Sequence, residues 1–158
     1  IDAVSHIQPY ALQCLQERSG ATILTDGLDL YGKGYSDCVL AARTPLLEEK
    51  PEAVKAVIKA MMTAQLMTEQ DTLSTLEETV GKYYKTSLES LKLAQSSQPV
   101  MIDQRNNTKF FYDRSVSMQK MGYVKNTLPS KAINWNLLEE VIAENGDLYG
   151  ELDLKTAA

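Results

Sequence analysis

The sequence predicts an α/β fold with a few short strands and five or six helices. Two observations support this fold class. The first 43 residues contain short apolar runs of strand length, separated by glycine-containing turns. From residue 44 onward, apolar residues recur at the three- and four-residue spacing of amphipathic helices. The chain has 158 residues, of which 44% are hydrophobic and 23% charged, and these values are typical of a globular domain with a real core.

The first part of the chain carries the predicted strands. Residues 1–7 form an extended-looking stretch, and Pro9 suits the first turn of the helix that follows. Residues 21–24 and 38–42 are short apolar runs of strand length on either side of a glycine-rich loop. Because isolated strand pairs are marginal in water, we expect these strands to pair mainly with strands outside this chain.

The rest of the chain carries most of the predicted helices. Pro51 suits the first position of a long helix, and Asp71 is a good N-cap for the next one. Thr86 and the glutamate three residues later match a capping box. Further helices are expected after residues 106–108 and after Asn134. The apolar stripes of the first and last of these helices contain Val54, Val57, Ile58, Met61, Trp135, Leu138, Val141 and Ile142.

Charge and hydropathy exclude several classes of protein. The formal net charge of −5 argues against a nucleic-acid partner, because such proteins usually carry a basic face. No stretch approaches the roughly 18–20 uninterrupted apolar residues of a membrane span. The sequence opens with Ile-Asp-Ala-Val, without a methionine or a basic segment, so we expect it to be a piece of a longer protein.

Metal and cofactor binding are not expected. His6 is the only histidine, and neither Cys14 nor Cys38 lies at ligand spacing from it. The two cysteines could form one disulfide or pack as small apolar side chains, and the sequence leaves both alternatives open. The glycines between residues 27 and 34 match neither of the common phosphate-binding patterns, so no cofactor is predicted.

Several motifs, in order, are similar to those of one known family. They are Ile-Asp-Ala at 1–3, Ile-Gln-Pro-Tyr at 7–10, Ile-Leu-Thr-Asp-Gly at 23–27, Pro-Glu-Ala-Val-Lys-Ala at 51–56, and Phe-Tyr-Asp at 111–113 with Met-Gly-Tyr-Val-Lys at 121–125. This set resembles the SsuA/TauA-like solute-binding proteins of ABC importers, which capture nitrate, sulfonates, taurine and thiamine-pyrimidine precursors. The resemblance covers this whole chain, and it corresponds to about the last half of a family member.

The resemblance implies a periplasmic-binding-protein fold of type II, of which this chain would be the C-terminal portion. Residues 1–36 would form the end of the second lobe and the hinge crossover, and residues 37–158 would return to the first lobe. The missing N-terminal half of the same protein would supply most of the parallel sheet. The implied partners are a small-molecule ligand and an ABC permease in the membrane. The implied location is extracytoplasmic, in the periplasm or lipid-anchored outside the cell membrane.

The same resemblance directs attention to two groups of candidate ligand-binding residues. The first lies where a predicted strand runs into a helix whose N-terminus could hold an anion, and the second lies near the predicted hinge. These residues are His6, Gln8, Pro9, Tyr10, Asp26, Tyr31 and Tyr35. Gln8 stands where the family commonly has an acidic residue, and Ile7 stands where it has tryptophan, so a strongly cationic ligand is disfavoured. A structural role for His6, and packing roles for the two tyrosines, remain alternatives.

The predicted function is therefore capture of a small polar organic molecule or oxyanion, without catalysis. One alternative is an enzyme resembling a thiamine-pyrimidine synthase, but the lone histidine has no cysteine cluster beside it. Others are a ligand-sensing domain of a signalling protein and a plain helical interaction module. We expect Phe110, Phe111, Tyr112 and Trp135 to anchor helices to the first lobe, and Arg105 to belong to a turn rather than to an anion site.

Overall fold

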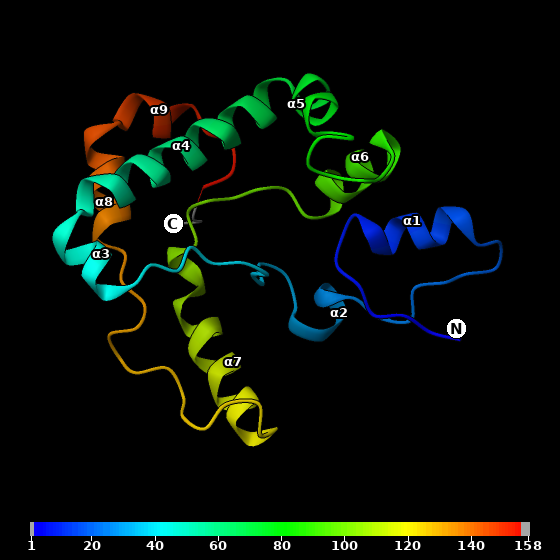
Figure 1. Ribbon diagram of the computed structural model, residues 1–158, viewed down its shortest axis with the longest axis horizontal. Coiled ribbons are helices and arrows are strands. Elements are labelled where there is room, and N and C mark those ends of the chain that lie inside the picture. Colours follow the sequence, from blue (N-terminus) through cyan, green and yellow to red (C-terminus); the bar gives the residue numbers. More distant parts are fainter. Residues whose placement is uncertain (1, 156–158) are drawn as a thin grey trace.

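The computed structural model describes residues 2–155 and is largely helical. Helices account for 57% of the residues and strands for 1%, and the described residues form no sheet (Figure 1). The helices in chain order are α1 (Tyr10–Glu17), α2 (Gly27–Tyr31), α3 (Thr44–Glu49), α4 (Pro51–Gln70), α5 (Thr72–Thr79), α6 (Leu88–Ser97), the 3-10 turn η1 (Arg105–Asn107), α7 (Thr108–Lys120), α8 (Asn136–Glu144) and α9 (Gly146–Glu151).

The predicted α/β fold is wrong. The apolar runs at 21–24 and 38–42 are not strands, and their large side chains are exposed, as in Leu24 at 84% and Val39 at 64%. A strand is stabilised by pairing with another strand and by burial of one face. These two runs have neither. Residues 2–7 also lack strand structure, while Ile1 of the first motif lies outside the described residues. The type II periplasmic-binding-protein architecture therefore does not describe this structure.

The predictions of helices agree with the structure better than the predictions of strands. All six predicted helices are present as α1, α4, α5, α6, α7 and α8, and three short helices were not predicted. Helix α4 begins at Pro51. The Asp71 carboxylate caps α5 by accepting the Ser74 N–H at 3.1 Å. The capping box at Thr86 is wrong by one residue, because the Ser87 hydroxyl caps α6 by accepting the Ser90 N–H at 3.1 Å. The Thr86 hydroxyl is buried without a hydrogen-bond partner in the described part of the chain.

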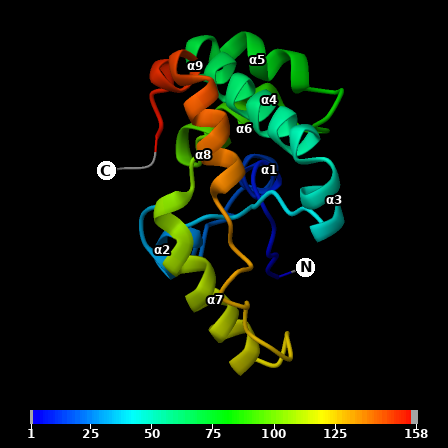
Figure 2. The same ribbon diagram turned by 90° about the vertical axis from the view of Figure 1, so that its left-hand side faces the viewer.

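One small core joins the long helix α4 to the C-terminal helices. Figures 1 and 2 show α8 and α9 packed along α4, with α7 descending from this layer. Met62 of α4 and Val141 of α8 are each only 1% exposed. The other buried apolar members of this core are Val54, Ile58, Leu138 and Leu152. The apolar stripe that the sequence predicts for α4 is thus the face that packs on α8.

A cation sits at the edge of this core. Lys55 is 8% exposed, and its ammonium group is hydrogen-bonded to Glu144 and lies 3.5 Å from a carboxylate oxygen of Glu140. Hydrogen bonding to Glu144 raises the pKa of Lys55 to about 12, against the opposing effect of burial. The pairing fixes α8 on α4 in one register.

The N-terminal part packs loosely by comparison. Between residues 2 and 43, Pro9 is the one buried residue. Helix α1 contacts α6, where the Ser90 hydroxyl donates to the Gln16 side chain at 2.5 Å. Cys14 and Cys38 are free, so no disulfide links them. The predicted domain boundary between residues 36 and 37 stays a prediction.

No helix among residues 2–155 combines the length and the hydropathy needed to cross a membrane.

Candidate functional site

The first group of predicted site residues lies at the start of α1. The rings of His6 and Tyr10 are 5.2 Å apart between centroids, and Pro9 between them is buried. The Gln8 side-chain oxygen accepts the Leu12 backbone N–H at 3.2 Å. Gln8 therefore acts as a local helix cap, a use of the side chain that the sequence did not predict.

Three N–H groups in the first turn of α1 are already engaged, those of Ala11, Leu12 and Gln13. The N–H of Ala11 donates to the Ile7 carbonyl and that of Gln13 to the Pro9 carbonyl, each at 3.1 Å. The Gln8 side chain accepts the N–H of Leu12, which lies between these two residues. Helix N-termini bind anions through N–H groups that lack an acceptor. The expectation that this helix start holds an anion is thus not supported by its hydrogen bonds.

The second group of predicted residues gathers around α2. The Asp26 carboxylate caps this helix by accepting the Asp29 N–H at 2.9 Å. The Tyr35 ring lies directly over Gly27, and a Cβ placed on Gly27 would be 2.2 Å from the tyrosine Cζ. The glycine is therefore required for the close approach of Tyr35 to the start of α2. Within residues 2–155, no hydrogen bond or ring contact joins this group to the residues at the start of α1.

Tyr31 is the centre of a cluster that the two predicted tyrosines form with helix α7. Its ring lies 5.8 Å from the Tyr35 ring and 5.9 Å, edge to face, from the Phe110 ring. The Arg114 guanidinium lies over the same ring, 4.4 Å from its centroid. We call these four residues the Tyr31 cluster. Helix α7 carries Phe110 and Arg114 one turn apart, and the contacts of these two side chains with Tyr31 join α7 to α2.

The Tyr35 hydroxyl is the polar end of the cluster. It accepts a hydrogen bond from the Gln98 side chain at the end of α6. Burial and the negative charge of Asp37 raise the pKa of Tyr35, and Asp26 acts in the same direction. The phenol therefore stays protonated near neutral pH and can serve as a hydrogen-bond donor.

Arg114 differs from the other arginine near α7. The Arg105 guanidinium is already bound by Asp103, with Nε to Oδ1 at 3.0 Å and Nη2 to Oδ2 at 2.8 Å. The side chain of Arg114 is half-buried, and its guanidinium lies over the face of Tyr31. None of the described residues 2–155 gives Arg114 a hydrogen-bond acceptor or a carboxylate partner.

A buried polar network holds the start of α7 in place. Asp103 is 3% exposed, and its carboxylate accepts hydrogen bonds from Arg105 and, at 2.6 Å, from the Tyr149 hydroxyl of α9. Hydrogen bonding to Asp103 raises the pKa of Arg105 further above its usual range. The Trp135 indole N–H donates to the Thr108 hydroxyl at 2.9 Å. These bonds join Trp135 to the first residue of α7, and they place Arg105 in a structural network.

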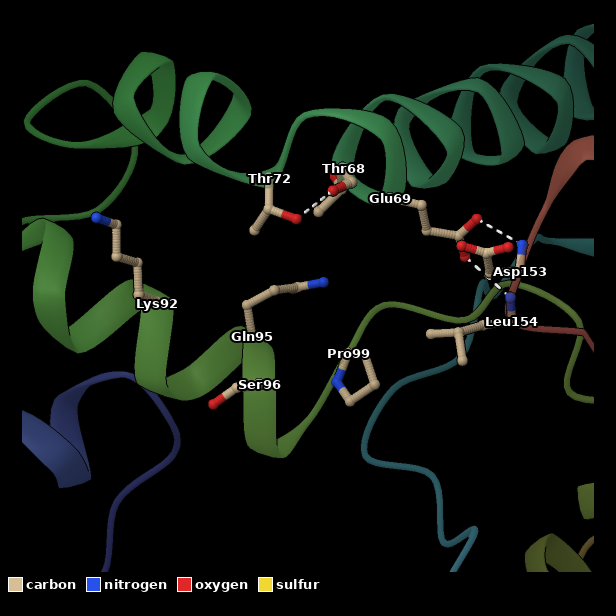
Figure 3. Close-up of a pocket in the computed structure, with 9 residues that line it drawn as sticks. All are labelled: Thr68, Glu69, Thr72, Lys92, Gln95, Ser96, Pro99, Asp153 and Leu154. Atoms are coloured by element: carbon tan, nitrogen blue, oxygen red, sulfur yellow. Dashed lines mark hydrogen bonds between the residues drawn. The ribbon is translucent and has the colours of Figure 1, made fainter.

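An open groove of about 420 Å³ lies between the end of α4, helix α6 and the C-terminal segment (Figure 3). It is lined by Thr68, Glu69, Thr72, Lys92, Gln95, Ser96, Pro99, Asp153 and Leu154.

Most polar groups of this groove are already used within the protein. The Glu69 carboxylate accepts the backbone N–H groups of Asp153 and Leu154 at 2.8 and 3.1 Å. The Thr68 and Thr72 hydroxyls donate to backbone carbonyls at 2.8 and 2.6 Å. Figure 3 shows the Gln95 side chain extending from α6 toward the end of α4. The groove is thus mainly a seam where the C-terminal segment is fastened to α4.

The carboxylate of Glu69 is stabilised in its charged form. Burial opposes ionisation, but hydrogen bonds from Gln65 and from the N–H groups of Asp153 and Leu154 lower the pKa of Glu69. Gln65 itself is 1% exposed and completes the fastening by donating to the Leu154 carbonyl at 2.7 Å. Its oxygen accepts the Ile102 N–H at 2.8 Å.

Sequence reasoning identified half of the Tyr31 cluster. It selected Tyr31 and Tyr35, and it assigned Phe110 to helix anchoring, which the ring contact with Tyr31 supports. It missed Arg114 altogether. The available signal was the four-residue spacing of Phe110 and Arg114, which places an aromatic ring and a cation on one helix face.

Metal chemistry has no support from side-chain grouping. Within the described part of the chain, no three His, Cys, Asp or Glu side chains are placed to hold a metal ion. Comparison of the chain with models of protein families, with curated proteins and with solved structures gives no match.

Proposed function

We propose that the chain belongs to the extracytoplasmic solute-binding component of an ABC importer, and that it binds a small polar organic molecule or oxyanion. The ordered motifs described above support this proposal. The observation that carries it is the Tyr31 cluster, where aromatic faces, a neutral phenol and an unpaired guanidinium lie together at the surface. Such a mixture of apolar surface with a few polar groups is typical of small-molecule sites.

In this proposal, binding involves no bond cleavage. Tyr31 is 41% exposed, so the cluster can cover one side of a ligand but cannot enclose it. A second wall would come from the remainder of the protein, which would close over the ligand before docking to the membrane permease. The small molecule, the permease and the N-terminal half are the proposed partners.

A thermal-shift screen of the protein as its gene encodes it tests the proposal. The panel contains nitrate, organic sulfonates, pyrimidines, amines and carboxylates. A ligand that binds the folded protein stabilises it by roughly 2.7 kcal/mol at 100 times its Kd. At about 2–4 °C per kcal/mol, this corresponds to a rise in Tm of roughly 5–11 °C. The proposal is contradicted if no compound of the panel raises Tm and if deletion of the gene does not reduce cellular uptake of any of these compounds.

A helical interaction module is the second candidate. It is favoured by the absence of a sheet among the described residues and by exposed apolar side chains between residues 2 and 43. Large side chains in this part, such as Ile7 at 70% and Leu24 at 84% exposed, are typical of surfaces that a partner covers. The two candidates separate in the same screen, because an interaction module gains no stability from small molecules.

A further inference from the structure

Arg114 has the properties of a prepared anion-binding group. Its guanidinium is held on the Tyr31 ring at 4.4 Å, which limits the positions that the side chain can take. It is half-buried, yet no described residue pairs with it. Withdrawing a charge from water without a partner is unfavourable. An arginine in this state is well suited to an anion that arrives from outside.

A second donor lies against the same ring. The Tyr35 hydroxyl accepts a hydrogen bond from Gln98, and its own hydrogen has no acceptor among residues 2–155. The Tyr31 ring contacts both the Tyr35 ring, at 5.8 Å, and the Arg114 guanidinium. The charged fork and the neutral O–H donor therefore both belong to side chains that contact the Tyr31 ring.

Nearby negative charges restrict the kind of anion. Asp26 and Asp37 both act electrostatically on Tyr35, so they lie close enough to oppose a highly charged ligand. The electrostatic repulsion from these two carboxylates is about twice as large for a dianion such as sulfate or doubly ionised phosphate as for a monoanion. The planar guanidinium also matches the planar geometry of a carboxylate, which it binds through two parallel N–H donors.

We propose that Arg114 and Tyr35 bind the carboxylate group of a small organic monocarboxylate, whose body lies on the aromatic faces of Tyr31 and Phe110. This inference rests on the proposed function and names the ligand class of the same site. It assigns Arg114 a role in recognition that the sequence motifs do not indicate.

The test uses titration calorimetry of the protein as its gene encodes it, with acetate, butyrate and benzoate as probes. The corresponding amides, acetamide, butyramide and benzamide, have the same shape without the charge. We expect at least one carboxylate to bind tenfold or more tightly than its amide. Arg114→Lys keeps the charge but loses the two-donor fork, and we expect it to weaken carboxylate binding at least tenfold. Tyr35→Phe removes one O–H donor, and a loss of about three- to tenfold is expected.

Lys109→Gln is the control for a general effect of charge on binding. Lys109 is exposed on the same helix and pairs with Asp113 at 2.5 Å, so this variant removes one positive charge from α7 outside the Tyr31 cluster. We expect it to leave carboxylate affinity within twofold. The Tm of each ligand-free variant shows whether Arg114 merely holds α7 against α2.

The outcomes distinguish the two proposals. A carboxylate that loses affinity in Arg114→Lys but not in Lys109→Gln supports the inference. Equal binding of acids and amides, or an Arg114→Lys variant with lower Tm and unchanged affinity, overturns it. If only nitrate, sulfonates or pyrimidines bind, and Arg114→Lys does not affect them, the inference fails while the proposed function stands. If no compound of the wider panel binds, the proposed function fails.

Discussion

Replacing Gln65 with methionine tests how the C-terminal segment is fastened to α4. The two side chains are similar in size, so the change removes polar groups with little change in packing volume. In the native protein the Gln65 amide donates to Glu69 at 2.8 Å and to the Leu154 carbonyl at 2.7 Å. Its oxygen accepts the Ile102 N–H at 2.8 Å. The variant leaves the Leu154 carbonyl and the Ile102 N–H without the hydrogen bonds that Gln65 makes to them.

The expected loss of stability follows from those two groups. A buried donor or acceptor left unsatisfied costs about 1–3 kcal/mol. Ile102 and Leu154 are both half-buried, so the lower part of that range applies to each. We expect Gln65→Met to reduce the free energy of unfolding by about 2–4 kcal/mol, and Tm by roughly 4–16 °C.

Urea denaturation followed by circular dichroism measures this difference. Gln70→Met, on the same helix, is the control, because Gln70 is exposed and we expect a change within about 0.5 kcal/mol. If Gln65→Met is no less stable than Gln70→Met, the three hydrogen bonds do not fasten the segment and the reasoning is refuted.

Three other variants test separate parts of the structure. Met62→Ala, in the core at 1% exposure, should lower the free energy of unfolding by about 2–5 kcal/mol in the same denaturation assay. Because the folded-state pKa of Glu69 is lowered, its stabilising contribution is present above its unfolded pKa of about 4.3 and disappears as pH falls through the lower folded value. The stability difference between the native protein and Glu69→Gln should therefore be largest at neutral pH and shrink toward pH 3; a difference independent of pH would contradict the assignment. Gly27→Ala should displace the Tyr35 ring and remove the NOE between the Tyr31 and Tyr35 rings in NMR spectra. Gly150→Ala is the control, because no atom lies within 4 Å of its added Cβ, and it should leave that NOE intact.

The helices could be predicted from the sequence because their signals are local. A proline at position 51 and an aspartate at 71 mark helix starts through contacts made within one turn. The error at Thr86 shows the limit of such signals. Thr86 and Ser87 are adjacent and chemically similar, and only the backbone geometry decides which hydroxyl reaches the Ser90 N–H.

The strands could not be predicted in the same way, because a strand depends on a partner. Residues 21–24 and 38–42 have strand-like composition, but composition does not specify what they pair with. In the described structure they find no pairing, and side chains such as Ile23 and Leu40 stay at least half exposed. The strand predictions are wrong because the runs lack the pairing that a strand requires.

The candidate site illustrates the same difference. Tyr31 and Tyr35 were selectable because they flank a glycine-rich loop in one short stretch of sequence. Arg114 lies more than 80 positions after Tyr31 and joins it only through the packing of α7 beside α2. A residue of this kind cannot be found from spacing until the helix pairing is known.

The position of Arg114 depends in turn on residues that are far from the Tyr31 cluster. Helix α7 starts directly after η1, which the Asp103 carboxylate ties to Tyr149 of α9. The Trp135 indole N–H donates to the hydroxyl of Thr108, the first residue of α7. These bonds are made within the better-packed part of the chain, whereas α2 lies in the loosely packed N-terminal part. The guanidinium is therefore presented by the rigid part, and the Tyr31 ring can move with the part that has few buried contacts. A ligand that bridges Arg114 and Tyr35 would join these two parts, so its binding should order residues 26–35 more than any other segment.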